Sequence, residues 1–149
     1  MKQGFGDTFK KKLEAFNALK ERLPKLLGNE AKNNFQDNFT KQGFEGGKWT
    51  EVQRRISGTN SYKYPKTKGL GRRTKAILSG TGKLKKDIQV KEVSFGKTVV
   101  GTSSITEDYA MVHNEGTATI PQRKFIGGSQ NLTNKMKEII FKELKKLFA

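Results

Sequence analysis

The sequence predicts an α+β fold, in which a small, mostly antiparallel sheet packs against N- and C-terminal helices. Apolar residues recur every three or four positions near both ends of the 149-residue chain, as in amphipathic helices. Shorter apolar runs with partial alternation lie between these ends, which is typical of strands. A basic, glycine-rich stretch without any period separates the first helices from the strands.

Both ends of the chain are expected to be helical. Residues 7–23 carry an apolar stripe that resumes over residues 25–40. Pro24 is expected to kink this helix or to start a second one, because proline lacks the N–H that a continuous helix needs there. Residues 129–148 show the clearest helical period of the chain.

The strands are expected in the second half of the chain. Residues 87–93 and 98–103 predict a hairpin, joined by a short turn. Residues 106–116 then predict a short helix that ends in glycine. Residues 117–127 are expected to add one or two further short strands, with Pro121 at an edge or bend.

One domain is expected over residues 1–149, with residues 52–76 as a flexible basic loop. The net charge is +16, and residues 52–86 hold eleven basic and no acidic side chains. Such a charge density would attract a polyanion such as DNA. Two alternatives stay open: a loop that pairs with an acidic protein partner, and a solvated loop that only keeps the protein soluble. The candidate contacts are Arg54, Arg55, Lys63, Lys66, Lys68, Arg72, Arg73, Lys75, Lys83, Lys85 and Lys86.

No enzyme chemistry is expected. The chain has one histidine, His113, and no cysteine, whereas a metal site usually needs three or four converging ligands. The run "GTGKLKK" departs from a phosphate-binding loop because Leu84 follows Lys83. We therefore expect no catalytic residue, no metal and no cofactor, and a His113 that satisfies backbone groups at a helix end. A nuclease that relies on His113 stays open as a minor alternative.

No membrane association is expected either. The sequence holds no run near the roughly 20 apolar residues of a membrane span. Its beginning, "MKQGFGDTFKKKLEAF", lacks the apolar core of a signal peptide. The protein is therefore expected to be soluble and to be made and used inside a cell.

Four sequence blocks resemble the phage virion morphogenesis family, the tail-completion proteins of tailed bacteriophages and prophages. They are, in the family's order, "NFTKQGFEGGKW", "ILSGTGKLKKDIQV", "VVGTSSITEDYAMVHNEG" and "IPQRKFIGGS", and they are distributed within residues 34–148. The chain departs from the family pattern at Lys124, where a second proline is common, and at Asp87, where serine is usual.

The resemblance implies a structural virion assembly protein that completes the tail or joins head and tail. It implies a homo-oligomeric ring, for example a hexamer, at the neck or tail end of the virion, with assembly in the host cytoplasm. Its partners would be further copies of itself, neighbouring neck or tail proteins and the packaged double-stranded DNA. The segments 43–49 and 116–128 are the expected contact surfaces, with Phe44, Trp49, Arg123 and Phe125 as interface candidates.

The alternative function is a stand-alone basic nucleic-acid-binding protein. The basic segment alone supports it, because charge gives affinity for a polyanion without any family resemblance.

Overall fold

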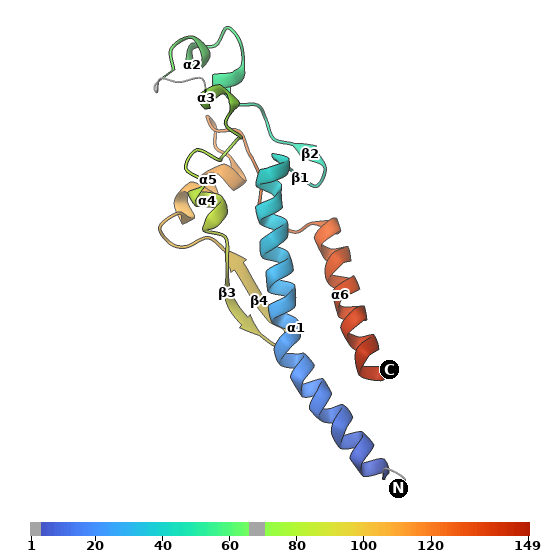
Figure 1. The fold of residues 1–149 in the computed structure, drawn as a ribbon. Coiled ribbons are helices and arrows are strands. Elements are labelled where there is room, and N and C mark those ends of the chain that lie inside the picture. The colour runs from blue at the N-terminus through green and yellow to red at the C-terminus, as the bar shows by residue number, and fades with distance from the viewer. Residues whose placement is uncertain (1–3, 66–70) are drawn as a thin grey trace. The chain divides into compact units, whose positions relative to one another are not determined.

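The computed structural model describes residues 4–65 and 71–149, without the side chains of residues 71 and 72. The predicted α+β class is confirmed (Figure 1): long helices α1 (Phe5–Lys41) and α6 (Gln130–Phe148) occur with two small antiparallel two-stranded sheets. Contacts divide the chain into two compact units. Unit 1 comprises Met1–Asn33, Val90–Val100 and Gly128–Ala149, and unit 2 comprises Asn34–Gln89 and Gly101–Gly127.

Helix α1 runs through Pro24 as one helix, so the alternative that a second helix starts there is wrong. A proline inside a helix removes one hydrogen bond and costs about 3 kcal/mol. Packing along the same stretch offsets this cost, because Leu19 is only 4% exposed and Pro24 itself is buried. The Thr98 hydroxyl also donates to the Pro24 carbonyl at 3.3 Å.

The sheet of unit 1 is the predicted hairpin, formed by β3 (Gln89–Ser94) and β4 (Lys97–Gly101). It packs closely on α1 at Gly28. A β-carbon at Gly28 would lie 2.8 Å from Cγ2 of Thr98 and 3.1 Å from Cγ1 of Val90. Glycine in mid-helix is unfavourable by itself, but here it lets the strands approach the helix.

Helix α6 begins at the N-cap Ser129, whose side chain accepts a hydrogen bond from the Leu132 N–H at 3.1 Å. Its buried Glu143 pairs with Arg22 of α1 and accepts from Lys146 at 2.6 Å. The hydrogen bond from Lys146 holds the pKa of Glu143 below its ordinary value of 4.5, opposed by burial and assisted by the charge of Arg22. The Arg22–Glu143 pair joins α1 to α6 within unit 1, whereas the Lys146–Glu143 pair lies within α6.

Unit 2 is built mostly from short elements. Strands β1 (Gly43–Phe44) and β2 (Gly47–Lys48) form the second hairpin, with Gly43 opposite Lys48. The short turns and helices are η1 (Gln53–Arg55), α2 (Asn60–Lys63), α3 (Gly71–Thr74), α4 (Lys83–Lys86) and α5 (Glu107–Glu115).

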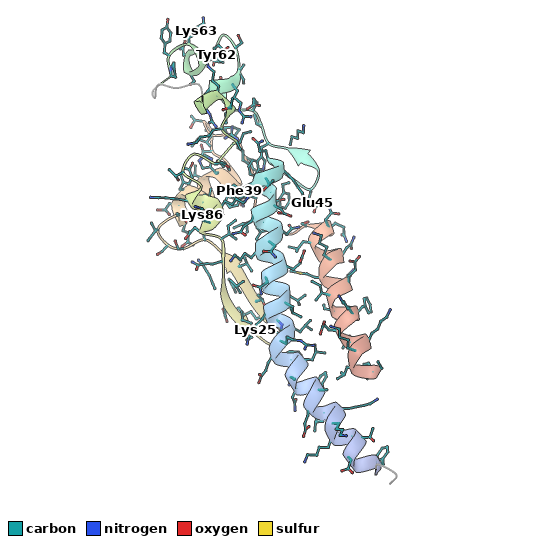
Figure 2. The ribbon with its side chains drawn as sticks, in the orientation of Figure 1. Lys25, Phe39, Glu45, Tyr62, Lys63 and Lys86 are labelled. Atoms are coloured by element: carbon teal, nitrogen blue, oxygen red, sulfur yellow. The ribbon has the colours of Figure 1, made fainter. Side chains whose placement is uncertain are left out.

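The core of unit 2 is aromatic. Phe39, near the end of α1, packs edge-on against Trp49 at 5.5 Å between ring centroids and against Phe125 at 4.9 Å. All three side chains are buried. Figure 2 shows Phe39 labelled on α1 within this unit.

Two details of unit 2 differ from the prediction. Residues 117–127 form no strand, although all of them are described. The segment 52–76 contains η1, α2 and α3 in its described part, so it is not a featureless loop there. Helix α5 matches the predicted helix over 106–116. Over the parts of the chain that the structure describes, no helix is long and apolar enough to cross a membrane.

Replacing Glu143 by Gln is expected to lower the stability of the folded protein at pH 7, because Arg22 and Lys146 lose their carboxylate. A lowered pKa means that Glu143 stabilises the fold above pH 4.5, and that this contribution is lost as the pH falls through its folded pKa. The unfolding free energy of the wild type should therefore fall more steeply on acidification than that of Glu143→Gln. Urea unfolding between pH 7 and about pH 3 measures both slopes.

Glu138 is the matched control, because it is exposed on the same helix. The variant Glu138→Gln should keep the wild-type slope. An equal slope for the wild type and Glu143→Gln would contradict the assignment.

Candidate functional site

Residues 121–126 are held by side chains in place of strand partners. The Asn114 Oδ1 atom, at the end of α5, accepts from the N–H groups of Phe125 at 2.9 Å and Ile126 at 3.0 Å. Asn38 Nδ2 donates to the Phe125 carbonyl at 3.0 Å, and Trp49 Nε1 donates to the Lys124 carbonyl at 2.7 Å. Buried backbone groups need partners, so these side chains explain why the segment stays ordered without forming a sheet.

The segment folds back onto α5 at Gly116. Its φ of 78° favours glycine, and a β-carbon there would lie 2.8 Å from the Gln122 nitrogen. The fold-back brings the Arg123 N–H within 2.7 Å of the His113 carbonyl. The histidine and the arginine are thereby placed side by side.

The start of α5 is fixed by Asp87. The Asp87 carboxylate accepts from the Ser103 N–H at 2.7 Å, from the Ser103 hydroxyl at 2.9 Å and from the Thr106 hydroxyl. Thr106 is the N-cap residue of α5, but its hydroxyl is bound to Asp87 and not to the helix. Asp87 thus anchors the loop that leads into the helix of His113.

Arginine side chains link separate parts of the basic segment through hydrogen bonds. Arg55 donates to the carbonyls of Arg73 at 3.0 Å and Lys75 at 2.6 Å, and it pairs with Glu51 at 3.3 Å. Arg54 donates to the Lys75 carbonyl at 3.1 Å. Arg73 donates to the Tyr62 carbonyl at 2.9 Å and lies over the Tyr62 ring, 3.9 Å from its centroid. These contacts hold residues 51–62 against residues 73–75.

A cavity of about 460 Å³ opens beside this arrangement. Among the described residues, three cationic side chains line it, from Arg54, Lys75 and Arg123, and no acidic side chain does. The described residues that line it are Val52, Arg54, Lys75, Ile77, Leu78, Gly80, Tyr109, His113 and Arg123.

Arg123 is the most buried of these cations, with 7% of its surface exposed. Its Nε donates to the Thr50 carbonyl at 3.1 Å. Burial lowers the pKa of Arg123, while the negative charge of Glu51 acts in the opposite direction. An arginine side chain nevertheless stays protonated in a protein, so the cavity wall carries a permanent charge.

The sequence predicts that His113 satisfies backbone groups at a helix end. The structure differs, because the His113 ring forms no such hydrogen bond within the described residues. Its Nδ1 atom is buried and has no hydrogen-bond partner among the described residues. The ring lies edge-on to Tyr109, 4.4 Å between centroids. Burial, and then the charge of Arg123, lower the pKa of His113 below its ordinary value of 6.5. The imidazole is therefore neutral at neutral pH.

The interface candidates divide by burial. Three of them, Trp49, Arg123 and Phe125, are buried in unit 2. They can therefore support the surface of this unit but expose little of their own side chains on it. Phe44 is half-buried in the β1–β2 hairpin, with the Lys124 ammonium 5.1 Å from its ring centroid. A contact role for the segments 43–49 and 116–128 stays a prediction that rests on their exposed residues.

The basic candidates fall into those whose side chains bind other parts of the chain and those whose side chains do not. In addition to the arginines that link the basic segment, Lys75 donates to the Gly80 carbonyl at 2.7 Å and Lys85 to the Thr40 hydroxyl at 2.9 Å. Lys63, Lys83 and Lys86 are exposed, and their ammonium groups have no partner within residues 4–65 and 71–149; Lys63 and Lys86 are labelled in Figure 2. Lys66, Lys68 and the side chain of Arg72 lie outside the described residues.

Sequence reasoning missed the residues that organise this region, namely Asn38, Asn114 and Asp87. Asn114 carried a weak signal, because it stands two residues before the glycine that ends α5. The partners of Asn38 and Asp87 lie far along the chain, and no local pattern marks them.

Comparisons with known protein families, with curated proteins and with solved structures found no match to this chain. Within the described residues, no group of three or more histidine, aspartate or glutamate side chains could hold a metal ion. The features that the site does offer are cationic charge, a concave surface and hydrogen-bond donors.

Replacing Asn114 by Ala is expected to destabilise the protein by about 2 kcal/mol, because two N–H groups lose their acceptor. Asn134→Ala is the control, since Asn134 accepts only an exposed hydrogen bond from Gln130 at 2.9 Å. Chemical denaturation of both variants measures the difference. Equal stabilities would show that Asn114 does not hold the 121–126 segment.

Proposed function

We propose that this chain is a structural assembly protein of a tailed bacteriophage or prophage. It completes the tail or joins head and tail, as a subunit of a homo-oligomeric ring at the neck or tail end of the virion. The observation that carries the proposal is an uncovered apolar stripe on the first turns of α1.

The stripe consists of Phe5, Phe9, Leu13 and Phe16. Their spacing of four, four and three residues places them on one face of the helix. Their exposure falls from 90% at Phe5 to 41% at Phe16, and the next apolar residue, Leu19, is only 4% exposed. A contiguous row of large apolar side chains in water is typical of a protein–protein contact.

Unit 1 carries further exposed apolar side chains outside α1. Phe95 in the β3–β4 turn and Phe141 and Phe148 on α6 are each more than half exposed. A single copy of the chain therefore leaves several aromatic groups in water, and subunit contacts would cover them.

The sequence blocks support the same conclusion independently. They lie within residues 34–148, whereas the stripe lies at residues 5–16. A ring needs two different patches on each subunit, since its contacts are head-to-tail. The stripe and the surface of the 43–49 and 116–128 segments are suitable as two such patches.

A nucleic-acid-binding protein is the second candidate. It is favoured by Lys63, Lys83 and Lys86, which are exposed and without partners in the described residues. In the ring, the same lysines would face the packaged DNA or an acidic neighbour.

The wild-type protein is expected to associate more strongly as salt rises to about 0.5 M, because salt screens the repulsion between subunits of charge +16. The double variant Phe9→Ser with Leu13→Ser should stay monomeric under the same conditions. Sedimentation velocity or light scattering across the salt series measures the mass.

The control is Tyr64→Ser with Ile105→Ser, which removes two exposed apolar side chains outside the stripe. It should associate like the wild type. A monomer at every salt concentration, together with tight and sequence-selective DNA binding, would favour the second candidate.

Duplex DNA binding is expected to weaken when Lys63, Lys83 and Lys86 are all replaced by Gln. The slope of log K against log salt should fall by about 0.9 for each phosphate contact that is lost. The control replaces the exposed Lys137, Lys142 and Lys145 of α6 by Gln, which changes the charge equally. Equal losses of slope in fluorescence titrations would mean that net charge alone attracts the DNA.

A further inference from the structure

We infer that the cavity lined by Arg54, Lys75, His113 and Arg123 is a binding site for a carboxylate, supplied by an acidic side chain of a protein partner. That the partner is a neighbouring virion subunit rests on the proposed function. The preference for a carboxylate does not, because it follows from the cavity itself.

The first argument is the positive charge of the cavity wall. Arg54, Lys75 and Arg123 line the cavity, and none of the described residues that line it is acidic. Glu51 is the acid whose charge acts on Arg123, but its carboxylate already accepts from the Val52 N–H at 2.8 Å and from Arg55 at 3.3 Å. Arg123 is buried, and buried charges are normally paired, so an anion would complete the site beside it.

The second argument is the geometry of Arg123. Its Nε donates to the Thr50 carbonyl, which fixes the orientation of the guanidinium group. Its two Nη groups form no hydrogen bond or ion pair with any residue that the structure describes. A guanidinium group presents donors in a planar fork that matches the two oxygens of a carboxylate.

The third argument is the unpartnered Nδ1 of His113. A buried polar atom without a partner calls for an explanation, such as a ligand that completes its bonding. With its proton on Nδ1, the neutral ring can donate to a carboxylate oxygen. The titratable and charged groups around the ring are Tyr109 on the same helix and Arg54, Lys75 and Arg123 on the cavity wall.

The fourth argument is a strained residue in the wall. Leu78 has a φ of 57°, a left-handed conformation that non-glycine residues rarely adopt. Such conformations gather at binding sites, where the surrounding structure maintains them. Leu78 lines the same cavity as the three cations.

The shape favours an acidic side chain over the phosphates of a duplex. Arg123 is 7% exposed, and Val52, Ile77 and Leu78 give the cavity an apolar wall. The phosphates of a duplex lie in a rigid row outside its grooves and cannot enter such a recess. A glutamate or aspartate side chain can enter it, with its methylene groups against the apolar wall.

The test uses His113 as a reporter, because it is the only histidine of the chain. N-acetyl-glutamate α-amide is titrated into the protein at constant ionic strength, and the imidazole resonances are followed by NMR. We expect a saturable shift and a rise in the pKa of His113, because a nearby negative charge favours the protonated ring. The neutral analogue N-acetyl-glutamine α-amide should cause neither change.

Three variants locate the site. Arg123→Lys keeps the charge and removes the planar fork, so the affinity should fall about tenfold. Lys75→Gln removes a charge from an exposed side chain of the cavity rim and should weaken binding about threefold. Lys86→Gln removes an exposed lysine that does not line the cavity, and it should stay within about twofold of the wild type.

Each outcome decides between the possibilities. A saturable response to the glutamate probe that Arg123→Lys and Lys75→Gln weaken supports the site. No saturable response, or an equal response in Lys75→Gln and the wild type, overturns it. Tighter binding of inorganic phosphate than of the glutamate probe overturns the carboxylate assignment in favour of a phosphate ligand. The titration needs no oligomer. Binding of the glutamate probe can therefore be detected even if the protein forms no ring, and ring formation can be detected even if the probe does not bind.

Discussion

The structure of unit 2 depends on side chains that hydrogen-bond the backbone of residues 121–126, a segment that forms no strand. Residues 121–126 lie against no strand, and Asn38, Asn114 and Trp49 supply the missing donors and acceptors. The same contacts bury Phe125 against Phe39 and carry Arg123 to the cavity wall. Three side chains therefore supply hydrogen bonds that a neighbouring strand would otherwise supply. The segment can then adopt a backbone conformation other than that of a strand.

The regular elements were predictable because their signals are local. The helices α5 and α6 and the β3–β4 hairpin follow from apolar periodicity, caps and turn residues that lie within each segment. The start of a second helix at Pro24 was predicted wrongly because the lost helical hydrogen bond is a local effect. The packing that offsets this loss comes from residues far along the chain, such as Thr98. The strands expected over 117–127 failed for the same reason, since side-chain partners from other segments replaced the sheet.

The candidate site was predictable only in part. The sequence marked Arg54, Lys75 and Arg123 as basic or contact residues and set His113 apart as the only histidine. It could not show that these residues meet, because they come from separate segments that long-range contacts join, such as those from Arg54 to the Lys75 carbonyl and from Arg123 to the Thr50 carbonyl. The burial of Trp49 and Phe125 was likewise set by their partner Phe39, near the end of α1.

The arginine contacts of the basic segment have a consequence for how this sequence can change over time. Arg54, Arg55 and Arg73 each bridge separate stretches of backbone through their guanidinium groups. A lysine has the same charge but lacks the planar, multi-donor fork that makes such bridges. Neutral drift between the two basic amino acids should thus be tolerated at Lys63 or Lys86 and selected against at Arg55, although every such exchange leaves the isoelectric point almost unaltered.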